Sequence, residues 1–154
     1  MRAVISTGSN LGDGLGLLQG VVDKLEPYKA SAVYETEPWG GVEQPVFVNQ
    51  VLLVEWPGTA KELLATCQEL ERQAQRVREV RWGPRTLDVD IVDVEGVVSD
   101  DPELTIPHPR AHEREFVLLP WLEADPEAKL HGKPLQFWLE QLEPQGVRRL
   151  EDEP

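Results

Sequence analysis

The alternation of apolar and polar positions along the chain predicts several β-strands separated by helical segments. Strand patterns cover residues 2–6, 29–36, 46–56, 86–94 and 147–150. The residues GVVS at 96–99 are expected to form a hairpin with the strand before them. Two glycine- or proline-rich stretches, TGSNLGD at 7–13 and EPWGGVEQP at 37–45, are expected to be turns and loops.

Apolar residues that recur at intervals of three and four predict two long helices and two shorter ones. The first long helix covers about 14–26, with Asp13 as its N-cap and an apolar face made by Leu18, Val22 and Leu25. The second begins at a capping box of Thr59 and Glu62 and has the core stripe Leu63, Cys67, Leu70, Ala74 and Val77. The shorter helices are expected near 116–124 and 134–142.

The predicted order is β-α-β-β-α-β with additions at the C-terminus. This order is typical of an α+β fold, a ferredoxin-like antiparallel sheet with helices packed on its faces. The length of 154 residues suits one domain over 1–154.

The formal net charge of −13 argues against general binding to nucleic acid or an anionic membrane, because both require a basic surface. Cys67 is the one cysteine, which excludes an internal disulfide and suits a reducing cytoplasm. No stretch is apolar over the roughly 18 residues of a membrane span, and MRAVISTGSN at the start lacks a signal-peptide pattern. We expect a cytoplasmic monomer whose partners are small molecules.

The stretch RWGPRTLDVDI at 81–91 places Asp88 and Asp90 on one face of a predicted strand. Leu87, Val89 and Ile91 are expected on the opposite face. Val92 and Val94 are expected on the aspartate face, so the acids would lie at one end of a covered strand. The alternative is an ordinary half-buried strand whose charged face meets water.

Two carboxylates without a nearby cysteine or histidine cluster suit Mg²⁺, which keeps most of its waters and also binds substrate phosphates. Four arginines, which match phosphate oxygens in pairs, precede them: Arg76, Arg78, Arg81 and Arg85. The combination predicts a site for a nucleoside triphosphate with magnesium. Alternatively, some of these arginines pair with Glu69, Glu71 or Glu79. The chain has neither a P-loop motif nor the kinase motifs H-R-D and D-F-G.

RWGPRTLDVDI, together with PHPRAHEREFVLLP at 107–120 and STGSNLGD at 6–13, resembles the 6-hydroxymethyl-7,8-dihydropterin pyrophosphokinases of folate synthesis. The resemblance runs from Val4 to about Leu122. It implies a ferredoxin-like enzyme that transfers the terminal diphosphate of ATP to the hydroxymethyl group of the reduced pterin and releases AMP. It also implies two Mg²⁺ ions.

Carried over to this sequence, the resemblance makes Asp88 and Asp90 the ligands of both metals. It makes these two aspartates catalytic together with Arg76 and Arg85, and it implies no covalent intermediate. The implied ATP contacts are Gln68, Glu71, Arg78, Arg81, Trp82, Arg85, Ile91, Thr105, His108 and Arg114. The implied pterin contacts are Thr36, Trp39, Phe47, Asn49, Trp82, Asp88 and Phe116.

For the pterin, the resemblance implies a ring held between Phe47 and Phe116, with Asn49 reading its amino-oxo edge. Without the resemblance, Phe47 and Phe116 would be more typical of core residues. His108, between two prolines, would be more typical of a residue that packs within a loop. A buried amide such as Asn49 needs hydrogen-bond partners, which a heterocycle supplies.

The sequence departs from the family pattern near the second long helix. The loop before Trp82 is about one residue shorter than in some members, and this gap would move the role of Arg76 to Arg78. Gln75 stands where a glycine is common, so the helix is expected to continue, and Glu79 stands where a basic residue is common.

Two alternative functions remain at this point. The first is another magnesium-dependent phosphoryl or nucleotidyl transferase on the same fold, acting on a different heterocycle. The second is a non-catalytic ligand-sensing ferredoxin-like module, which predicts a dimer formed through an exposed sheet.

Overall fold

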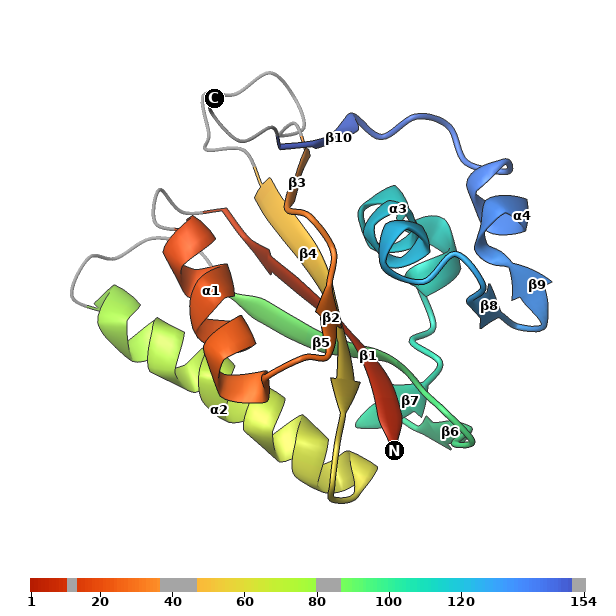
Figure 1. The fold of residues 1–154 in the computed structure, drawn as a ribbon. Helices are drawn as coiled ribbons and strands as arrows, with labels where there is room; N and C mark the ends of the chain where they lie inside the picture. The colour runs from red at the N-terminus through yellow and green to blue at the C-terminus, as the bar shows by residue number, and fades with distance from the viewer. Residues whose placement is uncertain (11–13, 37–46, 80–86, 151–154) are drawn as a thin grey trace.

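The computed structural model describes residues 1–10, 14–36, 47–79 and 87–150 (Figure 1). Its centre is an antiparallel sheet in the order β10-β3-β4-β1-β5, with β2 also paired to β4. The strands are β1 (Arg2–Ser9), β2 (Lys29–Ala30), β3 (Tyr34–Thr36), β4 (Phe47–Glu55), β5 (Asp88–Val94) and β10 (Val147–Arg149). The order β3-β4-β1-β5 is that of a ferredoxin-like sheet, so the predicted fold class is confirmed.

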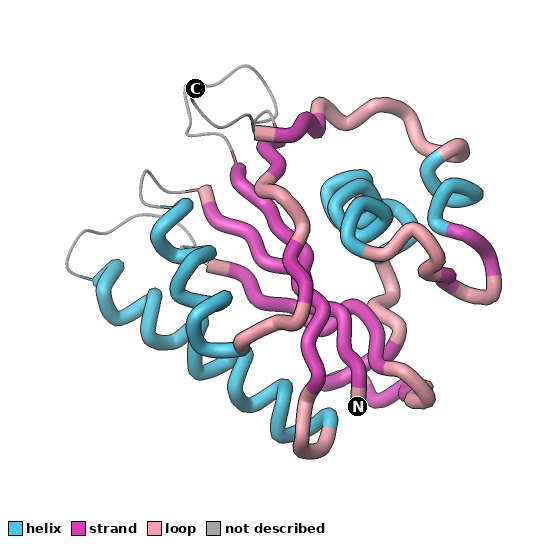
Figure 2. The backbone as a smooth tube through the Cα atoms, viewed as in Figure 1, coloured by secondary structure: helices cyan, strands magenta, loops and turns pink. Residues whose placement is uncertain are grey.

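Two long helices cover one face of this sheet (Figures 1 and 2). They are α1 (Gly14–Leu25) and α2 (Ala60–Glu79). The predicted capping box begins α2: the Thr59 backbone N–H donates to Glu62, and the Glu62 backbone N–H donates to the Thr59 hydroxyl. Leu63, Cys67 and Ala74 of the predicted stripe are buried against the sheet. The helix continues to Glu79, as the Gln75 substitution predicted.

A separate layer covers the opposite face (Figure 1). Its main element is α3 (Glu115–Ala124), whose Trp121 is fully buried among Val51, Leu53 and Val92 of the sheet. Around it lie the 3-10 turn η2 (Ala111–Glu113), the hairpin β8 (Lys129–Leu130) and β9 (Lys133–Pro134), and α4 (Leu135–Leu139). None of the helices in the described part of the chain is both long and apolar enough to span a membrane.

Four predicted element boundaries are wrong. β1 continues through Thr7–Ser9, where a turn was expected, because it is a central strand paired with both β4 and β5. The strand expected over 29–36 is divided into β2 and β3. The expected hairpin at 96–99 is reduced to one bridge, Val94 to Val97, and the following hairpin is β6 (Ser99–Asp101) with β7 (Leu104–Ile106). The last helix is shorter than 134–142.

A β-bulge in β5 changes which face its last residues occupy. Asp90 pairs with Ser6 and Ile91 with Ile5, but Asp93 rather than Val92 pairs with Val4. Val94 therefore packs in the helix-side core, and its expected position on the aspartate face is wrong, while Val92 lies on that face as predicted. The proposed Asp13 cap and the loop 37–45 lie outside the described residues.

Candidate active site

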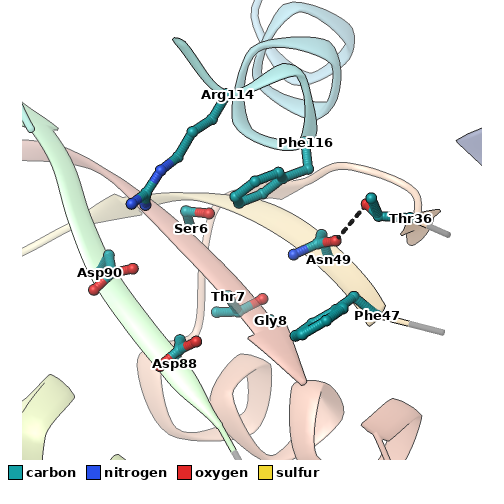
Figure 3. A pocket seen from close by; sticks show the side chains of 10 residues that line it. All are labelled: Ser6, Thr7, Gly8, Thr36, Phe47, Asn49, Asp88, Asp90, Arg114 and Phe116. Carbon is teal, nitrogen blue, oxygen red and sulfur yellow. Dashed lines mark hydrogen bonds between the residues drawn. The ribbon is translucent and has the colours of Figure 1, made fainter. Parts of the chain in front are cut away.

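A cavity of ≈350 Å³ opens on the α3 side of the sheet, at the ends of β1, β4 and β5 (Figure 3). It is lined by Ser6, Thr7, Gly8, Thr36, Phe47, Asn49, Asp88, Asp90, Arg114 and Phe116. We call it the first cavity. Six of the residues predicted from separate parts of the sequence to bind pterin or ATP, together with Asp90, meet here.

Strand register determines the floor of this cavity. Gly8 in the central strand pairs with Asn49 on one side and with Asp88 on the other. Two residues earlier in β1, Ser6 pairs with Asp90. Paired residues of adjacent antiparallel strands point to the same face, so both aspartates and the Asn49 amide face the same space. Asp88 and Asp90 thus share a face, as predicted.

The Asn49 side chain is held in one orientation. It is 6% exposed, and its Oδ1 accepts a hydrogen bond of 3.1 Å from the Thr36 hydroxyl. Phe47, two residues earlier in β4, is 38% exposed, so it is not a core residue. The rings of Phe47 and Phe116 lie on either side of the Asn49 amide in Figure 3. A flat polar ring placed between them would meet two aromatic faces and one amide edge.

Arg114 adds a positive charge to the first cavity. Its guanidinium carbon lies 5.7 Å from the centroid of the Phe116 ring, a cation–π distance. Figure 3 shows the side chain extending from the start of α3 toward the strands that carry Ser6 and Asp90. An arginine directed to the neighbourhood of two carboxylates suits a substrate that brings phosphate between them.

A second cavity, of ≈230 Å³, lies on the other side of Asp90. Its lining residues are Leu64, Val89, Asp90, Ile91, Pro102, Glu103, Leu104, Thr105, His108 and Pro109. Asp90 therefore lines both cavities, and three residues predicted to contact ATP, namely Ile91, Thr105 and His108, line this one. The Thr105 hydroxyl donates to the Asp101 carbonyl at 3.0 Å, which connects the two strands of the β6–β7 hairpin.

His108 is held as a neutral imidazole. Its Nδ1 accepts a hydrogen bond of 3.1 Å from the Arg110 backbone N–H, which leaves the proton on Nε2. Burial lowers the pKa of His108, and the charges of Arg114 and Arg110 lower it further, while Asp90 opposes them. At neutral pH the second cavity therefore receives an N–H donor from this ring rather than a full positive charge.

Glu71 has a structural partner. Its Oε2 accepts a hydrogen bond of 2.8 Å from the backbone N–H of Val89, between the two aspartates. Cys67, one helical turn earlier, has a pKa raised to about 12 by burial first and then by the charges of Glu71 and Asp90. Gln68 is exposed, and neither Gln68 nor Glu71 is among the described residues that line the two cavities.

The donor set fits magnesium better than a metal that prefers histidine or cysteine. Among the residues that the structure describes, no group of three or more His, Cys, Asp or Glu side chains is arranged to hold a metal ion. Two neighbouring carboxylates, with space for water and phosphate oxygens, are the ligands that Mg²⁺ takes at phosphoryl-transfer sites.

Several predicted site residues lie outside the described part of the chain. These are Trp39, Arg81, Trp82 and Arg85, and the side chains of Arg76 and Arg78 are also not described. In the other direction, sequence reasoning did not assign Ser6, Thr7 and Gly8 to the site. The one signal for them is the string STGSNLGD, which contributes to the family resemblance but assigns no role to these three residues.

The class that the fold and the site define is an α+β protein whose two small-molecule cavities share Asp90. The family model for 7,8-dihydro-6-hydroxymethylpterin-pyrophosphokinase matches residues 4–126. The chain belongs to this family.

Known proteins support this assignment over nearly the whole chain. The pyrophosphokinase of Mycobacterium tuberculosis (strain H37Rv) is 45% identical over 159 residues, which cover 93% of this chain and 85% of that protein. Its counterpart in Methylorubrum extorquens is 37% identical, and the alignment covers 97% of this chain and 99% of that protein. The enzyme is therefore a pyrophosphokinase of folate biosynthesis, which transfers pyrophosphate from ATP to hydroxymethyldihydropterin.

A solved structure supports the fold independently. The crystal structure of Plasmodium falciparum HPPK-DHPS aligns with a TM-score of 0.64 at 13% identity, covering 91% of this chain and 41% of that one. The ligand-sensing alternative is wrong, because the family assigns an enzyme activity. Helices also cover both faces of the sheet, so the exposed sheet that this alternative required is not present in the described structure.

Proposed function

We propose that Asp88 and Asp90 hold two Mg²⁺ ions at the junction of the two cavities, with pterin in the first cavity and ATP in the second. The observation that carries this proposal is that Asp90 lines both cavities. A phosphoryl transfer needs the attacking oxygen and the phosphorus in contact. The junction is where a ring in one cavity meets a triphosphate from the other.

The first cavity suits the pterin for reasons of shape and polarity. Phe47 and Phe116 supply the aromatic faces, and Asn49, fixed by Thr36, supplies an amide for the ring's polar edge. Asp88 would lie nearest the hydroxymethyl end, since Gly8 separates it from Asn49 in the register. By the family resemblance, Trp39 and Trp82 complete this site.

The second cavity suits the nucleotide. Ile91 gives an apolar wall, Thr105 a hydroxyl, and His108 a neutral N–H donor. Arg114 lines the first cavity and its charge also acts on His108 of the second, so it would be within reach of phosphate placed between them. By the resemblance, Arg76, Arg85, Arg78 and Arg81 add phosphate contacts, and Gln68, Glu71 and Trp82 add nucleotide contacts.

In the proposed reaction, the pterin hydroxymethyl oxygen attacks the β-phosphorus of ATP and loses its hydroxyl proton to solvent. The bond from that phosphorus to the α,β-bridging oxygen breaks, and AMP leaves. Bound magnesium supplies neutralisation of the phosphate charge. The residues of the chain hold the two substrates in line and stabilise the developing charge without forming a covalent intermediate. We also propose that the chain acts as one domain, as a monomer and in the cytoplasm.

A product assay tests this reaction directly. The protein, ATP, Mg²⁺ and 6-hydroxymethyl-7,8-dihydropterin should yield AMP and the pterin diphosphate in equal amounts, and chelation of the metal should stop turnover until Mg²⁺ is restored. ADP as the product would reject attack at the β-phosphorus.

A substitution tests the metal site. Asp90→Ala should abolish turnover while the protein stays folded, because removing one of two like charges relieves repulsion. Asp23→Ala is the matched control, since it removes an exposed carboxylate from α1, on the opposite face of the sheet. An Asp90→Ala enzyme with the wild-type rate would show that the metal is bound elsewhere.

A further inference from the structure

Gly8 occupies the position between the two functional side chains of the first cavity. In the central strand it pairs with Asn49 of β4 and with Asp88 of β5. Figure 3 shows the Asn49 amide and the Asp88 carboxylate on either side of it. The described glycines with positive φ are Gly96, Gly132 and Gly146. Gly8 has ordinary strand conformation, so backbone conformation does not explain the glycine.

The space above Gly8 is filled by its neighbour. A Cβ atom built on Gly8 would lie 2.7 Å from Asn49 Nδ2, 3.6 Å from the Val48 carbonyl oxygen and 3.9 Å from Asn49 Cγ. The first distance is too short for a real contact. The Asn49 amide therefore rests where the side chain of any other residue would begin.

The amide is fixed from both sides. The Thr36 hydroxyl on β3 donates to Oδ1. On the other side, Nδ2 lies close to the backbone of Gly8 on β1. A Cβ on Gly8 would push the amide away from β1. The end of a side chain moves more readily than a central strand, so Asn49 would rotate about its side-chain torsions and break the Thr36 bond.

We propose that Gly8 is a positioning residue for the ring substrate: its missing side chain sets the orientation of the Asn49 amide and keeps the floor open toward Asp88. This inference rests on the proposed role of Asn49 in pterin binding. Gly8 itself acts through Asn49.

The first experiment compares Gly8→Ala with Gly20→Ala. Gly20 lies exposed on α1, and a Cβ built there meets nothing within 4 Å, so this control adds the same methyl group without a clash. Gly8→Ala should weaken pterin binding roughly tenfold or more, the loss of one or two aligned hydrogen bonds. ATP binding with Mg²⁺ should stay near the wild-type value for both variants. Calorimetric titration of each ligand measures both quantities.

The second experiment is a double-mutant cycle with Asn49→Ala. If Gly8 acts through the amide, Gly8→Ala should weaken pterin binding no further in the Asn49→Ala background. The double variant should also melt at a higher temperature than Gly8→Ala alone, because removal of the amide removes the clash. This recovery tests the contact even if the single variant folds poorly.

The outcomes separate this inference from the proposed function. If Asn49→Ala weakens pterin binding but Gly8→Ala does not, or if the two losses add, the positioning role is wrong and the role of Asn49 stands. If neither substitution changes pterin binding, the positioning role and the assignment of Asn49 are both overturned. Non-additive losses with recovery of the melting temperature support the proposal.

Discussion

The carboxylate of Glu71 on α2 accepts a hydrogen bond of 2.8 Å from the backbone N–H of Val89. Val89 lies between Asp88 and Asp90, and β5 is at the edge of the sheet. The backbone N–H groups on the outer side of an edge strand have no neighbouring strand to pair with and need another partner. Glu71 supplies it, so a helix side chain anchors the segment that carries both aspartates.

Glu71→Ala should therefore lower both stability and activity. The unpaired N–H of Val89 is partly buried, and its loss of a charged partner is expected to cost about 1–3 kcal/mol of unfolding free energy. The Mg²⁺ concentration for half-maximal turnover should rise, because the aspartate segment is less rigid. Urea denaturation and a magnesium titration of the rate measure these two effects.

Two further variants identify the cause. Glu71→Gln keeps an acceptor oxygen and should recover most of the stability, and Glu69→Ala removes a carboxylate from the exposed side of the same helix and should change little. If Glu71→Gln behaves like Glu71→Ala, the charge of Glu71 matters rather than its hydrogen bond.

Asn49→Ala should weaken pterin binding and largely spare ATP binding. Of the two cavities, the amide lines the first and is not among the described residues of the second, and its loss should cost about 1–3 kcal/mol of pterin binding energy. Separate titrations with pterin and with ATP and Mg²⁺ measure the two affinities. Equal losses for both ligands would contradict the division of substrates between the cavities.

Gln50→Ala is the matched control for this prediction. Gln50 follows Asn49 in β4, points to the opposite face and donates to the Ser31 carbonyl at 2.8 Å. Its substitution removes an amide of the same strand away from the first cavity. It should leave pterin affinity unchanged.

Local signals explain what the sequence predicted of the fold. The capping box at Thr59 and the alternation of Asp88 and Asp90 depend on neighbours a few residues away, and the structure contains both. The bulge at Val92 and the extension of β1 through Ser9 depend on pairing with strands far along the chain. Composition alone gave Thr7–Ser9 the appearance of a turn, and two-sided pairing overrides it.

The residues of the candidate site also fall into those that local sequence signals predict and those that depend on distant strand pairing. Asn49, Asp88 and Asp90 are polar residues within apolar strand patterns, so the sequence alone indicates that they belong to a site. Gly8 has no side chain to give a signal, and its importance depends on the register that places it beside Asn49. Ser6 ends the strand predicted over 2–6 and Thr7 begins the turn predicted over 7–13, and neither prediction marks a site residue.

Cys67 should resist alkylation in the folded protein. The thiol is fully buried, and burial, followed by the charges of Glu71 and Asp90, raises its pKa to about 12. The reactive thiolate is therefore scarce at about pH 8, where an ordinary thiol is substantially ionised. Labelling by iodoacetamide should be slow in buffer and fast in denaturing urea, with glutathione as the reference thiol. Rapid labelling without urea would show that α2 opens readily from the sheet.

His108 should make the protein less stable as the pH falls below neutral. Burial lowers its folded-state pKa below the ordinary value of 6.5. Between these two values the unfolded chain binds a proton that the folded chain does not, so stability rises with pH across this window and is lost as the pH falls through it. His108→Asn removes this contribution and should flatten the dependence of melting temperature on pH below about 6.5. If the melting temperatures of wild type and His108→Asn change equally with pH over this range, His108 has the same pKa in the folded and the unfolded protein.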